Sequence, residues 1–230
     1  MNDVSLNQTS SLEQSFIAAR LAGLVLLALS VMTLILVNAN SLLFPGSSVT
    51  TYLVVTALVS SLAVCILPIR SRLQARYAWI VSSLALLLLI YSKTLEPPMG
   101  DSAMLTSLWA QLFFLSRPIA LGLDIAAGVG YLLHAFGRDA RLESHSHLLS
   151  LLAGTAFLGG EIAGSYWAFI GWGRSWSWSG HFFFSALTYL LFILVFHLPK
   201  AWFANGKALA LGKAAVLGFI CVLMLGYRLS

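Results

Sequence analysis

Four tryptophans fall within the twelve residues 167–178, and a histidine follows three positions later. Single indole rings anchor helix ends at a membrane boundary, but four rings offer more flat aromatic surface than an anchor needs. Interleaved glycines let the backbone approach a ligand closely. The spacing predicts a binding surface for a large, planar, apolar ligand. Its expected residues are Trp167, Trp172, Trp176 and Trp178, with His181 as the neighbouring imidazole.

Two other histidines, His134 and His197, each stand at the end of an apolar run, one turn from a basic stretch. Two imidazoles that face each other across a helix bundle can ligate a b-type haem. Histidines at these positions also cap helix C-termini, where the helix dipole favours them. Both interpretations stay open. His145 and His147 are expected in a solvated loop, because two histidines without a third ligand make a weak metal site.

Asp124 and Glu161 are ionisable residues inside apolar runs. Such residues are costly in a bilayer and usually face the bundle interior near a partner. Arg117 precedes Asp124 by seven residues, which places both on one helix face. A polar cluster of Arg117, Asp124 and Glu161 is therefore expected. It is either a salt bridge between packed helices or a proton path beside a cofactor or quinone.

The elements that position these residues follow from composition. The chain has 230 residues, of which 59% are hydrophobic and 9% charged. That composition excludes a soluble protein and predicts an all-α, polytopic bundle in a single transmembrane domain over 1–230. Seven spans are expected, at about 17–38, 49–68, 76–93, 117–136, 148–170, 181–198 and 208–227. Pro118 disfavours helix at Arg117, so 103–115 is expected to be an interfacial helix that bends into the fourth span.

The net charge of +5 is interpreted as topology rather than as affinity for nucleic acid. Basic residues cluster between spans two and three, four and five, and six and seven, and lysine and arginine mark the cytoplasmic side. The N-terminus is then inside and the C-terminus outside, in a bacterial inner membrane, with the tryptophan segment at the external face.

The N-terminus lacks the basic region of a cleavable signal, so the first apolar run is expected to be retained. Without CxxC or CxxCH, the chain carries no dithiol or haem-attachment motif.

The stretch GSYWAFIGWGRSWSW resembles the tryptophan-rich "WWD" segment of the CcsA/CcmC/CcmF haem-handling proteins of cytochrome c assembly, most closely the CcsA branch. The run FSALTYLLFILVFHLPK resembles the family helix that ends in a histidine, here His197. Two departures stand out: Ser179 replaces the motif aspartate, and the position of the family's first external histidine falls near Phe113. Matching positions are Gly164, Trp167, Ala168, Trp172, Gly173, Trp176 and Trp178.

The resemblance implies non-covalent b-type haem as cofactor, presented at the external membrane face, with other membrane subunits of an assembly complex as partners. An accessory or non-catalytic member is the expected form. Two alternatives stay open. One is a b-haem or quinol-interacting subunit of a respiratory complex, and the other is a haem-free scaffold subunit.

Overall fold

The computed structural model describes residues 2–38, 48–95, 105, 107–175 and 180–229, and within them all the regular secondary structure is helical. Seven of the described helices are long and apolar enough to cross a membrane. The prediction of an all-α, multi-pass membrane protein is confirmed at this level. The elements are α1 Asn2–Asn38, α2 Val49–Ile66, α3 Arg72–Ser92, α4 Leu108–Gly137, α5 Ala140–Trp172, α6 Gly180–His197, the 3₁₀ turn η1 Lys200–Trp202, and α7 Gly206–Leu229.

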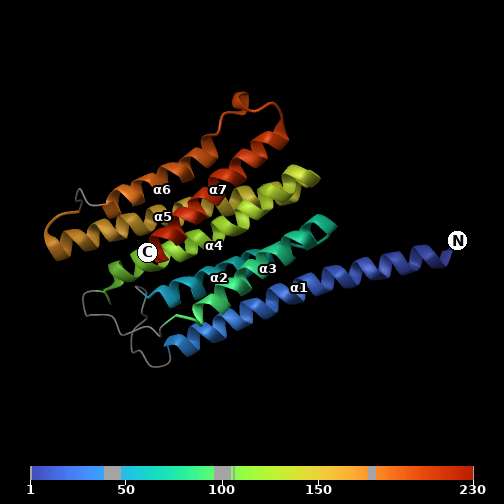
Figure 1. The fold of residues 1–230 in the computed structure, drawn as a ribbon, viewed down its shortest axis with the longest axis horizontal. Helices are drawn as coiled ribbons and strands as arrows, with labels where there is room; N and C mark the ends of the chain where they lie inside the picture. The colour runs from blue at the N-terminus through green and yellow to red at the C-terminus, as the bar shows by residue number, and fades with distance from the viewer. Residues whose placement is uncertain (1, 39–47, 96–104, 106, 176–179, 230) are drawn as a thin grey trace.

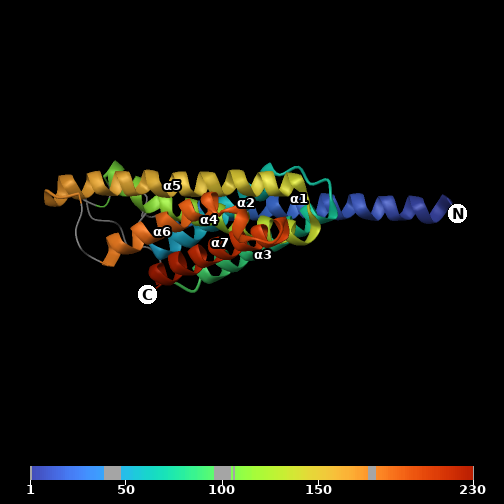
Figure 2. The same cartoon turned by 90° about the horizontal axis from the view of Figure 1, so that it is seen from above.

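Helix α4 lies at the centre of the bundle and packs against α2, α5 and α7. Helix α1 packs on α2 and α3, and its N-terminal part extends beyond the other helices (Figures 1 and 2). Large apolar side chains such as Ile35, Leu87 and Val222 remain exposed on the outside of the bundle. A bilayer, not water, is the solvent that suits such a surface.

The expectation that Pro118 interrupts the helix at Arg117, between an interfacial helix over 103–115 and the fourth span, is wrong for the residues that the structure describes there. Helix α4 begins at Leu108 and continues through Pro118 to Gly137. Ser107 caps its start, since its Oγ accepts the Ala110 N–H at 3.3 Å. Proline is tolerated inside membrane helices because packing against neighbours compensates for the lost hydrogen bond, and Pro118 is buried.

The prediction that His145 and His147 occupy a solvated loop is also wrong, because both lie within α5. Asp139 caps that helix, and its carboxylate accepts the Arg141 and Leu142 N–H groups at 3.0 and 3.1 Å. The helix therefore begins before the histidines. His145 Nε2 donates to the Ala63 carbonyl at 3.1 Å, which links α5 to α2.

Basic connections gather at one end of the bundle. Ser71 Oγ and Gln74 Nε2 both donate to Asp139 Oδ2 at 2.9 Å, which joins the α2–α3 turn to the α4–α5 turn. The α6–α7 connection lies at the same end (Figure 1). The arginine and lysine clusters of these three connections therefore share one face of the molecule.

Helices α2 and α4 meet at Gly122, where a side chain has no room. A Cβ atom there would lie 2.7 Å from the Thr56 carbonyl oxygen and 2.8 Å from Val59 Cβ. Ser60 Oγ donates to the Gly122 carbonyl at 3.1 Å across the same contact. Small residues that let membrane helices approach closely are typical of such interfaces.

We expect Gly122→Ala to destabilise the fold by about 1–3 kcal/mol, because the two backbones must separate to admit the methyl group. Gly159→Ala is the matched control, since a Cβ at Gly159 meets nothing within 4 Å. Unfolding of both variants by sodium dodecyl sulfate in mixed micelles measures the difference. Equal midpoints for the two variants would contradict the packing argument.

Candidate functional site

A pocket of about 280 Å³ opens where α4, the end of α5 and the start of α6 meet. Its floor and walls combine aromatic rings with charged groups. Gly164 lets α4 and α5 approach here, because a Cβ at this position would strike the Phe113 ring. Its lining includes Phe113, Glu161, Trp167, Trp172, Arg174 and His181.

The aromatic rings of the pocket contact one another in sequence. Trp167 and Trp172 meet edge to face, with ring centroids 5.2 Å apart. Phe113 lies 6.2 Å from Trp167 and 5.7 Å from His181. These separations are those of favourable aromatic pairs. Trp172 is 57% exposed, so its ring is not part of the core.

Trp176 and Trp178 lie outside the described residues, as does Ser179. The predicted four-ring surface is therefore described for Trp167 and Trp172 only. These two rings belong to one connected group with Phe113 and His181.

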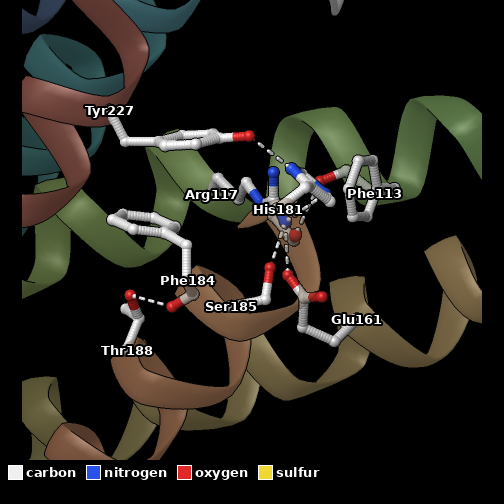
Figure 3. Close-up of polar contacts among 9 residues, drawn as sticks. Phe113, Arg117, Glu161, His181, Phe184, Ser185, Thr188 and Tyr227 are labelled. Atoms are coloured by element: carbon white, nitrogen blue, oxygen red, sulfur yellow. Dashed lines mark hydrogen bonds and ion pairs between the residues drawn. The ribbon is translucent and has the colours of Figure 1, made fainter. Parts of the chain in front are cut away.

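A polar cluster centred on Arg117 adjoins the aromatic pocket (Figure 3). Arg117 Nη2 donates to Glu161 Oε1 at 2.6 Å and to Ser185 Oγ at 2.8 Å. The same nitrogen lies 3.3 Å from His181 Nε2, and the guanidinium carbon stands 4.1 Å above the Phe113 ring. Arg117 and Glu161 are only 13% and 20% exposed. Charge, hydrogen bonding and aromatic stacking converge on one guanidinium.

The hydrogen bonds of His181 define its tautomer. Arginine has donors and no acceptor, so Nε2 of His181 accepts from Arg117. Nδ1 then carries the hydrogen and donates to the Tyr227 hydroxyl at 2.7 Å. A continuous chain of hydrogen bonds thus runs from Glu161 through Arg117 and His181 to Tyr227.

Helical spacing explains how the sequence builds this cluster. Phe113 and Arg117 are four residues apart on α4, and His181 and Ser185 are four apart on α6. Residues at i and i+4 share one helix face. Three helices therefore contribute through one face each, and α7 adds Tyr227 near its end.

The structure brings Arg117 and Glu161 together but gives Asp124 a different partner. Asp124 is fully buried, and its Oδ2 accepts a hydrogen bond from Cys221 Sγ at 2.8 Å. It lines an apolar groove between α3, α4 and α7. Asp124 and Arg117 are seven residues apart and share one face of α4. At Arg117 this face meets α5 and α6, whereas at Asp124 it meets α7.

His134 and His197 both lie at the basic end of the bundle, and each bonds to groups close to it in sequence. His134 Nδ1 donates to the Asp139 carbonyl at 2.9 Å, and its Nε2 lies 3.4 Å from Glu143 Oε2. His197 is exposed, and its Nδ1 donates to the Ile193 carbonyl of its own helix at 3.0 Å. These contacts are those of residues at helix C-termini. No contact within the described part of the chain joins the two imidazoles.

Sequence reasoning missed three members of the site: Ser185, Tyr227 and the ring of Phe113. Phe113 and Ser185 carry a signal in retrospect, since each stands one turn from a charged or imidazole residue. Tyr227 carries none, because its position beside His181 depends on how α7 packs on α6. Among the described residues no group of three or more metal-ligating side chains forms.

Comparison with protein-family models, with curated proteins and with solved structures finds no match for this chain. The class defined by the fold is a multi-pass helical membrane protein. Function must therefore be argued from the site itself.

Proposed function

We propose that this protein binds or handles haem at the aromatic pocket, on the external face of a bacterial inner membrane, as an accessory member of a cytochrome c assembly system. The single observation that carries the proposal is the joining of Trp167, Trp172 and Phe113 with the His181 imidazole in one pocket. The resemblance of 164–178 to the tryptophan-rich segment of the CcsA branch supports it.

The pocket residues fit one edge of a haem. Aromatic faces suit the macrocycle, and His181 supplies one imidazole. Arg174 lines the pocket and is exposed, so the pocket holds a cation that a propionate can use. The Nε2 lone pair of His181 is engaged by Arg117 and becomes available to iron only when that bond is broken. Bound haem would contribute an iron centre that takes axial ligands; the chain contributes the aromatic contacts, the cation and the imidazole.

The test is a haemin titration of the full chain in lipid nanodiscs, followed by absorption and tryptophan fluorescence. We expect saturable quenching of the tryptophans together with a shifted haem absorption band. Iron-free protoporphyrin is the control: it should quench the tryptophans without the spectral change of ligation. Absence of quenching with both compounds would exclude the proposed site and favour the scaffold interpretation.

A quinol-interacting subunit is the second candidate, and the chain Glu161–Arg117–His181–Tyr227 favours it. A linked acid, imidazole and phenol beside an aromatic slot suits a ligand that gives up protons. Saturable quenching by a short-chain ubiquinone, with no response to haemin, would select this function over haem handling.

The proposed orientation rests on the shared basic end and is tested with reporters. A fusion at Asn205 should read as cytoplasmic, and a fusion after Arg174 should read as external, because positive residues are retained inside. Alkaline phosphatase and green fluorescent protein fusions at both sites report opposite faces. Reversed readings would place the aromatic pocket inside and remove the support for external haem presentation.

A further inference from the structure

At the opposite end from the aromatic pocket, a second cavity of about 440 Å³ lies between the end of α4 and the starts of α5 and α7. Its lining mixes polar and apolar residues and includes two lysines. The residues that matter are Tyr131, His134, Glu143, Lys200, Asn205 and Lys213.

Lys213 is the unusual member of this group. It stands seven residues after Gly206, the first residue of α7, which is about 10 Å along the helix at about 1.5 Å per residue. Its Nζ lies 5.0 Å from the centre of the Tyr131 ring. Cations inside a membrane span are costly and normally have a partner. In the described chain neither Lys213 nor Lys200 forms a salt bridge with an acid.

Glu143 is the one acid among the described lining residues; its charge acts on Lys213, but it forms no salt bridge with either lysine. Glu143 is 55% exposed, and its Oε2 lies 3.4 Å from His134 Nε2. Asn205 uses its side-chain carbonyl to accept the Ala208 N–H at 2.9 Å, which leaves its NH₂ group as a donor at the start of α7. A helix start also favours an anion. The cavity therefore carries more positive charge, from two ammonium groups and a helix start, than the Glu143 carboxylate balances.

We propose that this cavity binds a phosphate group, supplied by the headgroup of an anionic phospholipid. The cavity lies at the basic end of the bundle, and Lys213 reaches it from within α7. Basic pockets between transmembrane helices on this side of a membrane bind anionic headgroups. Free inorganic phosphate has the same chemistry, and the test separates the two sources.

The test measures lipid retained by the full chain during native mass spectrometry from dodecyl maltoside. Dioleoyl phosphatidylglycerol, dioleoyl phosphatidylcholine and inorganic phosphate are added separately. We expect roughly tenfold greater retention of phosphatidylglycerol than of phosphatidylcholine, corresponding to about 1.4 kcal/mol. Competition by millimolar inorganic phosphate would assign the site to phosphate itself, whereas no competition would assign it to the lipid.

Lys200→Met and Lys213→Met should each lower phosphatidylglycerol retention several-fold. Lys207→Met is the matched control, because Lys207 belongs to the same end but contacts Phe136 at 4.8 Å outside this cavity. Lys200 lies on η1, away from the packed spans, so its variant tests the site even where Lys213→Met fails to fold. Unchanged retention in Lys200→Met, equal loss in Lys207→Met, or equal retention of both lipids would overturn the proposal.

Discussion

Replacing Arg117 by methionine is expected to destabilise the folded protein by about 3–5 kcal/mol, the usual cost of removing one partner of a buried ion pair. Methionine keeps the apolar stem of the side chain, so the loss is chiefly that of the guanidinium, including its contact with the Phe113 ring. Glu161 would remain as a carboxylate inside the bundle without its 2.6 Å partner. Ser185 and His181 would each lose a hydrogen-bond donor as well.

Unfolding by sodium dodecyl sulfate in bicelles measures this effect, and a double variant identifies its cause. Arg117→Met combined with Glu161→Gln removes both charges, so we expect it to recover at least half of the lost stability. Arg141→Met is the matched control, because Arg141 is exposed at the basic end. A double variant as unstable as Arg117→Met alone would show that the arginine acts through packing rather than by neutralising Glu161.

The sequence predicted the transmembrane helices well because length and hydropathy alone set them. An apolar run of about 20 residues must be helical in a bilayer, whatever it packs against. The errors fall where local chemistry was misjudged. The HSH histidines lie in α5 rather than in a loop because Asp139 caps the helix ahead of them. Pro118 does not end a helix here, because α4 continues through it.

The site was predictable only where a residue was anomalous in its own span. Arg117 and Glu161 stand out because charge is rare in apolar runs, and their pairing follows from the cost of leaving either alone. The partner of each charged residue could not be predicted in the same way. Asp124 is as unusual in its span as Glu161, but the helix that faces it depends on three-dimensional packing. Its partner is Cys221 of α7, not the expected Arg117. Tyr227 beside His181 is likewise a consequence of packing.

We expect His181→Ala to lower haem affinity by at least about tenfold. Loss of a residue that only orients a metal ligand already costs about that much, and His181 would be the iron ligand itself. His181 is the only imidazole among the described lining residues of the aromatic pocket. The substitution leaves Arg117 bound to Glu161 and Ser185, so the fold should persist. Haemin titration in nanodiscs, with unfolding measured in parallel, separates lost binding from lost structure.

His197→Ala is the matched control, since this exposed imidazole bonds only to the Ile193 carbonyl among its described contacts. A larger loss in His197→Ala than in His181→Ala would move the haem site to the other end of the bundle.

The reciprocal experiment adds a ligand at Phe113, the position near which the resembling family carries its first external histidine. Phe113 lies 5.7 Å from His181 and lines the pocket, so Phe113→His places a second imidazole beside the first. Two axial imidazoles hold haem iron more firmly than one, and we expect roughly tenfold tighter haemin binding with a six-coordinate absorption spectrum. Phe114→His is the control, because Phe114 contacts Trp167 but does not line this pocket. Tighter binding in both variants would indicate adventitious ligation, and tighter binding in neither would show that haem does not enter between Phe113 and His181.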